Sequence, residues 1–308
     1  MLPLTYLLAV FAAAPAPEDR ALAYLAREVP RWSAENKCYS CHNNGDAARA
    51  LYTAARRGRK VPARALADTS RWLARPAGWD HNGGEGEFSD KKLAALQFAA
   101  ALAEATDAGL VKGRDALAKA AGRVAGWQER DGRWAVGAGE AVGSPATHGT
   151  ALATYLARET LRRADAGKYR AAVARADGWA RKVSVKTVLD AAAVLLLLGR
   201  ADDAAARAQR RRCLELVRKG WSRDGGWGPY VNAAPEPFDT AVVVLALAAQ
   251  GGDEAAALAK RGRAFLIAHQ QEDGSWPETT RPAGRDSYAQ RLSTAGWATL
   301  ALLASSGR

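Results

Sequence analysis

A short string, in which an Asp-Gly pair precedes a tryptophan, returns at nearly constant intervals along this chain of 308 residues. The four strings begin at Asp131, Asp177, Asp224 and Asp273. A fixed period of 46 to 49 residues is typical of architectures in which each repeat is one supersecondary unit. One period earlier lies Asp80, closely followed by two glycines, and one more period back lies the segment 36–45. We therefore expect six repeats.

Each repeat is predicted to be a helical hairpin. The segments before the turns, such as 113–128 and 253–271, carry arginines and place apolar residues on one face only. The segments after the turns are apolar nearly all round: 150–156, 187–198, 240–249 and 294–303. A helix that is apolar on every side is surrounded by protein, so the alternation predicts an inner and an outer ring. The sequence thus predicts an all-α fold, an α/α toroid, as a single domain over residues 15–308.

The turns between these helices are rich in glycine and tryptophan. Glycine supplies the positive φ with which a chain reverses, and a buried tryptophan covers a large area of its neighbour. We expect the turn tryptophans to pack between adjacent hairpins.

The last repeat carries a motif whose spacing is that of a known family. The motif residues are Arg261, Gly262, Leu266, Gln270, Gly274 and Trp276. They match the QW repeat of squalene-hopene cyclases and related terpenoid cyclases, and the chain resembles this family. The cyclases share an α/α toroid with the protein prenyltransferases. The resemblance therefore implies the toroid fold.

The segment 235–244 resembles the part of the cyclases that holds the acid motif Asp-x-Asp-Asp-Thr-Ala. Glu236 stands at the first Asp of that motif and Asp239 at the last. Phe238 stands at the central Asp, which protonates the polyene in the cyclases. The resemblance implies Asp239 and Glu236 as candidate catalytic acids, and it argues against squalene cyclase activity. The zinc-binding residues of the prenyltransferases have no matching pattern here.

The strongest chemical motif lies in the first turn, at Cys38, Cys41 and His42. Covalent attachment of haem c needs two closely spaced thiols, which add across the vinyl groups, and an adjacent histidine that ligates the iron. The sequence therefore predicts one haem c at these residues. The alternative is a Cys38–Cys41 disulfide, with His42 as a polar loop residue.

A haem iron held by His42 can take a second axial ligand, and the other histidines are the candidates. The only methionine is Met1, so the usual methionine ligand is excluded after signal cleavage. His81 lies in the second turn and His269 shortly before the last one. Because ring closure places both turns beside the first, either is a candidate distal ligand, with His148 farther away.

The amino terminus and the charge bear on location and partners. Residues 1–14 form an apolar run, too short to span a bilayer, that ends before Pro15 and resembles a signal peptide. We expect an exported protein, periplasmic or extracellular, with an uncleaved anchor as the alternative. The formal net charge is +12, but the basic residues alternate with acidic ones on helices. Nucleic acid is therefore not an expected partner, whereas a redox partner or an apolar small ligand is.

One charged residue interrupts the inner helices. Asp190 lies within the apolar segment 187–198, where a charge is costly without a partner, and Lys186 is the expected partner.

Three functions stay open: a haem-linked electron-transfer or ligand-binding role, a terpenoid-cyclase-like enzyme acting on an apolar substrate, and a non-catalytic ligand-binding toroid.

Overall fold

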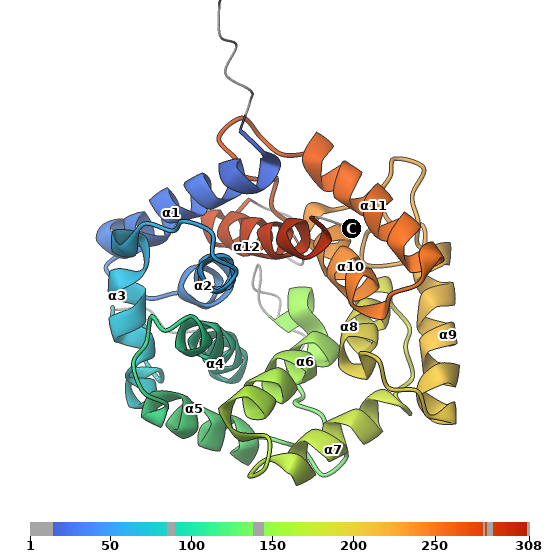
Figure 1. Ribbon diagram of the computed structural model, residues 1–308, viewed down its shortest axis with the longest axis horizontal. Coiled ribbons are helices and arrows are strands. Elements are labelled where there is room, and N and C mark those ends of the chain that lie inside the picture. Colours follow the sequence, from blue (N-terminus) through green and yellow to red (C-terminus); the bar gives the residue numbers. More distant parts are fainter. Residues whose placement is uncertain (1–14, 85–89, 138–144, 280, 282–285, 307–308) are drawn as a thin grey trace, which may run out of the picture.

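The computed structural model describes residues 15–84, 90–137, 145–279, 281 and 286–306, with the side chains of 145–147 excepted. The expected signal peptide, 1–14, lies outside the described residues. Within the described part, twelve α-helices form two concentric rings (Figure 1). The outer ring consists of α1 (Pro17–Asn36), α3 (Ala63–Leu73), α5 (Asp115–Gly126), α7 (Arg170–Ala180), α9 (Ala204–Lys219) and α11 (Asp253–Ala268). The predicted α/α toroid is confirmed.

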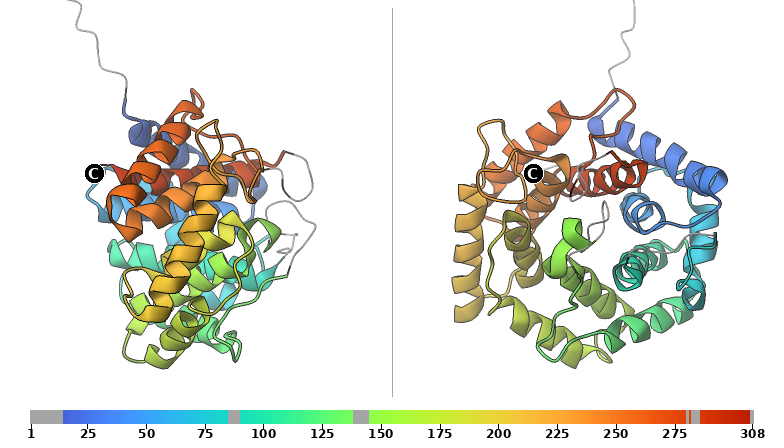
Figure 2. Two further views of the ribbon diagram at one scale, coloured as in Figure 1. Left: turned by 90° about the vertical axis from the view of Figure 1, so that its right-hand side faces the viewer. Right: turned by 180° about the vertical axis from the view of Figure 1, so that it is seen from behind.

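The inner ring consists of α2 (Ala48–Arg56), α4 (Lys91–Asp107), α6 (Pro145–Asp165), α8 (Val188–Leu198), α10 (Pro237–Gln250) and α12 (Tyr288–Ser305). A π-helix, η1 (Cys41–Ala47), leads directly into α2, and a short 3₁₀ helix, η2 (Pro76–Gly78), follows α3. Viewed from behind in Figure 2, the outer helices lie along the perimeter and the inner helices surround the centre of the ring. Among the described helices, none is both long and apolar enough to cross a membrane.

The division into rings follows from local sequence. In α8, nine of eleven residues are buried, because the helix is apolar on all sides. Its first turn is capped by the Thr187 side chain, which accepts a hydrogen bond of 2.9 Å from the Asp190 backbone. The outer helix α9 buries only a narrow stripe that includes Cys213 and turns its arginines outward. The inner and outer assignments made from hydrophobic periodicity are thus confirmed.

Three turns share one tryptophan geometry. Trp134, Trp227 and Trp276 are fully buried. In each case the indole N–H donates to the backbone carbonyl ten residues earlier, at 2.6 to 2.7 Å. The glycine two residues before each tryptophan has a φ between 94° and 103°. These turns confirm the sequence expectation for glycine and tryptophan.

The string that begins at Asp177 differs from the other three. It lies inside α7, and Gly178 is not among the residues with positive φ. Asp177 instead accepts a hydrogen bond of 3.1 Å from Arg158 of the preceding inner helix. The prediction of a turn at this string is wrong, because the residues continue the outer helix and the chain reverses after it.

The ring closes between the last turn and the first helix. The Gln270 amide donates to the Pro17 carbonyl of α1 at 3.0 Å, and Tyr288 donates to Glu28 at 2.6 Å. Gly274 lies directly on the α1 backbone, since a Cβ atom added to it would be 2.3 Å from the Arg20 carbonyl oxygen. The contact requires glycine for its space and for its φ of 94°.

We therefore expect Gly274→Ala to open the ring. The added methyl group combines an unfavourable φ with a clash against α1, and we expect a loss of about 3 kcal/mol in the free energy of unfolding. Urea denaturation measures it. The matched control is Gly58→Ala, whose φ is 78° but which has no atom within 4 Å of the new Cβ; it should cost only about 1 kcal/mol. Equal losses in the two variants would contradict the closing contact.

Candidate functional site

The predicted haem-attachment residues divide between a loop and a helix. Cys38 lies in the turn after α1, whereas Cys41 and His42 begin η1. Both thiols are free, so the alternative of a Cys38–Cys41 disulfide is not formed. Cys38 packs beside Gly84, and the Cys41 sulfur lies 3.5 Å from His42 Nδ1.

A haem fits this arrangement only in part. The two thiols are partly exposed and unpaired, as covalent attachment requires. The His42 side chain is packed inward, however, and the residue is only 8% exposed. An iron ligated by His42 would therefore displace groups that now cover the imidazole. No cluster of three or more potential metal-ligating side chains occurs among the residues with described positions.

The two proposed distal ligands occupy different places. The turn of His81 does adjoin the first turn, because the Tyr39 backbone donates to the Asn82 carbonyl at 2.6 Å. His269 is exposed and stacks on Phe265, with 3.9 Å between ring centroids. Its neighbour Gln270 contacts the start of α1, whereas Cys38 follows the end of that helix. A 20-residue helix is about 30 Å long, so the position of His269 does not suit a ligand to the same iron.

The two predicted acids do meet. Asp239, in the first turn of α10, is fully buried and accepts a hydrogen bond of 2.7 Å from Arg281. Glu236 lies 3.3 Å from the same guanidinium. Burial raises the pKa of Asp239 to about 7, against the opposing attraction of Arg281, and the charge of Glu236 adds to the rise. Near neutral pH the protonated and the ionised forms of this carboxyl group are therefore both populated.

Asp190 does not have its predicted partner. Lys186 is exposed and no ion pair joins the two residues, both of which are described. The helix begins only at Val188, so Lys186 does not share a helical face with Asp190. Burial raises the pKa of Asp190, and its hydrogen bond with Thr187 opposes that rise.

A buried polar cluster that the sequence did not reveal lies where η1 meets α4, α6 and α12. Its members are Asp46, Gln97, His148 and Ser293, each about 1% exposed. Asp46 Oδ2 is 2.6 Å from the Ser293 hydroxyl, 2.9 Å from Gln97 Nε2 and 3.2 Å from His148 Nε2. Burial alone would raise the pKa of Asp46, but His148, Arg49 and the Ser293 hydrogen bond outweigh it and lower the pKa to about 2.

This cluster carries a signal in its spacing. Asp46, Gln97 and His148 follow one another at intervals of 51 residues, slightly longer than the period of the turn strings. The aromatic rings of Phe238 and Trp297 lie next to it, 5.5 and 6.2 Å from the His148 ring. Polar residues at this regular interval, in or just before otherwise apolar inner helices, could have identified the cluster.

A central cavity of about 170 Å³ lies between the later parts of the inner helices. Its apolar lining includes Tyr155, Leu156, Leu245, Trp297 and Leu300. Its charged and polar lining includes Arg49, Thr53, Arg56, Arg57, Glu104, Glu159 and Arg163. The sequence analysis expected an apolar ligand within the toroid, but it named none of the residues that line this cavity as candidates.

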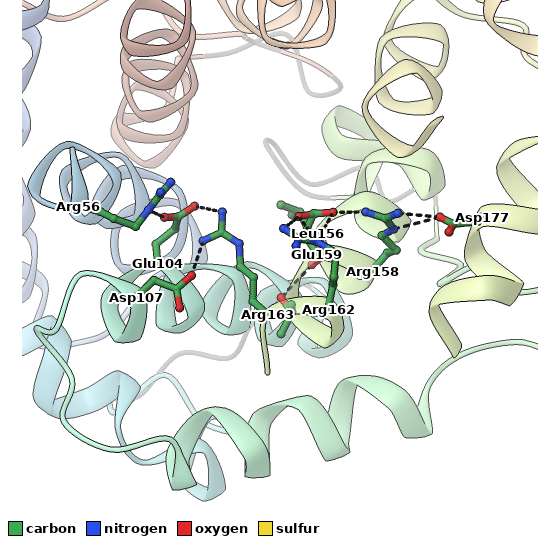
Figure 3. A network of polar contacts seen from close by, with 10 residues as sticks. Arg56, Glu104, Asp107, Leu156, Arg158, Glu159, Arg162, Arg163 and Asp177 are labelled. Carbon is green, nitrogen blue, oxygen red and sulfur yellow. Dashed lines mark hydrogen bonds and ion pairs between the residues drawn. The ribbon is translucent and has the colours of Figure 1, made fainter. Parts of the chain in front are cut away.

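Most charges in and around this cavity are paired, as Figure 3 shows. Glu104 lies 2.9 Å from Arg56 and 2.7 Å from Arg163, and Glu159 lies 2.9 Å from Arg162. Burial would raise the pKa of both glutamates, but the surrounding arginines lower it. Both glutamates are therefore ionised at neutral pH and are poor proton donors.

The comparisons with known proteins agree with this architecture. The model of the squalene-hopene cyclase C-terminal domain matches residues 69–308, and the chain belongs to this family. The match begins after the haem-like motif and after Asp46. None of the curated proteins compared with the chain matches it.

Solved structures of the type II terpene cyclase MstE from Scytonema have the same fold. The apo enzyme is 13% identical, with a TM-score of 0.60 over 93% of this chain and 96% of that chain. A variant of MstE in complex with geranylgeranyl dihydroxybenzoate, its substrate, is 14% identical with a TM-score of 0.59 over 94% and 98% of the two chains. At this level of identity the likeness concerns the fold alone.

The raised pKa of Asp239 predicts a pH-dependent stability. The folded state holds this proton up to about pH 7, whereas an unfolded Asp releases it near pH 4. The free energy of unfolding should therefore fall between about pH 4 and pH 7, by up to about 4 kcal/mol. Asp239→Asn should remove this decline, as measured by urea unfolding at several pH values. Asp203→Asn, at an exposed helix cap, is the control and should retain it. The same slope in wild type and Asp239→Asn would contradict the assignment.

Proposed function

We propose that this chain is a terpenoid-cyclase-like protein that binds a short isoprenoid-type ligand in its central cavity. The observation that carries the proposal is the apolar and aromatic lining at the centre of the ring, with Trp297 and Tyr155 facing the same cavity. The substrate bound by the MstE variant, which bears a geranylgeranyl group, supports this ligand class. Because about 170 Å³ equals roughly six water volumes of ~30 Å³, the cavity suits a small ligand or one end of a longer one.

Ligand binding is favoured over polyene protonation. A cyclisation started by a proton needs a neutral acid in contact with the substrate. Phe238 occupies the acid position, and Asp239 is turned to Arg281 and is not among the cavity-lining residues. The glutamates that line the cavity are ionised and paired with arginines. Asp239 and Glu236 are thus assigned a structural ion pair with Arg281.

Binding can be tested with geraniol and geranic acid, which share one ten-carbon isoprenoid body. Wild-type protein should bind at least one of them in calorimetric titration, and the recovered ligand should be chemically unchanged. Trp297→Leu removes the aromatic wall and should weaken binding about tenfold, since ~1.4 kcal/mol of contact is lost. Trp127→Leu, at the end of outer helix α5, should have no effect. Failure of both compounds to bind wild type, or recovery of an isomerised product, would contradict the proposal.

We also propose a second function, attachment of haem c at Cys38 and Cys41 with His42 as axial ligand. The free thiols, which stand in the required order, support this proposal. The burial of His42 opposes it, because the imidazole would have to be uncovered to bind the iron. On this proposal the exported protein would serve a redox partner or bind a ligand through the haem.

An absorption spectrum decides the haem proposal. Protein exported by cells with haem-maturation machinery should show a Soret band that survives denaturation. Cys38→Ala should abolish covalent attachment, because one of the two thioether links is lost. Cys213→Ala is the matched control: this thiol is buried in α9, where burial raises its pKa to about 12, and the band should persist. A colourless wild-type protein contradicts the proposal.

A further inference from the structure

We infer that Arg49 and Thr53 form an anion-binding site in the central cavity, so that the ligand proposed above carries a carboxylate or phosphate group. The inference rests on the proposed function for the apolar body of the ligand, and on Arg49 and Thr53 for its charged end.

Arg49 is a buried cation with no hydrogen-bonding partner among the described side chains. It lies in the first turn of inner helix α2 and is 7% exposed. Its guanidinium stacks over the Trp297 ring, 4.2 Å from the centroid, and its Nε is buried without a hydrogen bond. No described residue forms an ion pair with it. A guanidinium has five N–H donors, and leaving them unsatisfied in the protein interior is costly.

The neighbouring arginines differ from Arg49. Arg56 and Arg163 share Glu104, and Arg57 donates to the Leu303 carbonyl. Arg49 is thus the lining arginine whose donors are not used by the described part of the protein. The Trp297 face offsets part of the cost of burial through its cation–π contact with the guanidinium.

Asp46 does not neutralise Arg49 by direct contact. The Arg49 charge does help to lower the pKa of Asp46, so the two groups are near each other. Asp46 Oδ2, however, is already bound by Ser293, Gln97 and His148, and its Oδ1 has no hydrogen bond. No described residue therefore uses the donors of Arg49, and we assign these donors to a ligand.

Further donors converge on the same space. Thr53 follows Arg49 by one helical turn on the same face of α2, and its buried hydroxyl also has no hydrogen-bond partner among the described residues. The Tyr155 hydroxyl stays protonated, because burial raises its pKa to about 12. The cavity as a whole is lined by four arginines and two glutamates, so its net charge favours an anion. Arginine binds carboxylate and phosphate groups through paired N–H donors.

The experiment compares four probes: geraniol, geranic acid, geranyl phosphate and inorganic phosphate alone. At low ionic strength, wild-type protein should bind geranic acid or geranyl phosphate at least tenfold more tightly than geraniol. Arg49→Met should abolish this preference, so that the acids and geraniol bind with about equal affinity. Arg64→Met, on the exposed face of α3, changes the net charge equally and should leave the preference intact.

A second variant covers the case in which Arg49→Met does not fold. Arg49→Lys keeps the positive charge next to Asp46 but loses the paired donors, and it should bind the acids with intermediate affinity. Binding of geraniol with no preference for the acids, in wild type, would overturn the inference and leave the proposed function standing. Binding of inorganic phosphate that depends on Arg49, without binding of any geranyl compound, would support the anion site and overturn the proposed function.

Discussion

The architecture depends on one repeated contact, between a turn glutamine and the start of the next outer helix. Gln128 donates to the Gly132 carbonyl of its own turn and to the Ala172 carbonyl of α7, at 3.0 and 2.8 Å. Gln270 makes the same pair of bonds, at 3.1 Å to Gly274 and 3.0 Å to Pro17. The turn glycine then packs on the helix backbone three residues further on. This contact fixes two hairpins against their neighbours, and one of the two joins the last hairpin to the first and closes the ring.

Ring closure brings buried charges from distant repeats together, and their surroundings determine their protonation. Asp46 accepts from Ser293, Gln97 and His148 and is held ionised, with a pKa of about 2. Asp239 is equally buried but has Arg281 on one oxygen and the negative charge of Glu236 nearby, and its pKa is about 7. Carboxylates buried to the same degree thus differ in protonation because their donors differ in number.

The repeats made the fold predictable from sequence, since the period, the turn glycines and the alternation of apolar and amphipathic segments all report local structure. The string at Asp177 misled because the same letters can continue a helix as well as form a turn. Arg49 and Trp297 stack although 248 positions separate them, and only closure of the ring makes that contact. No local pattern could indicate it. The prediction for His269 failed for a related reason: the last turn contacts the start of α1, whereas Cys38 follows the end of that helix.

The inner ring combines a largely apolar wall with a few buried charges, of which Arg49 has no hydrogen-bonding partner among the described residues. In α8 and α10 the inner surface is built from Ala, Leu and Val, which bury without electrostatic cost. In α2 the corresponding surface carries Arg49, whose charge is offset by the face of Trp297 and by proximity to Asp46. A buried cation without a hydrogen-bonding partner costs free energy, so packing alone does not explain Arg49. Arg49 lies near the buried Asp46 cluster and also lines the cavity, and on our proposal an anion bound there would satisfy the donors that the described residues leave unused.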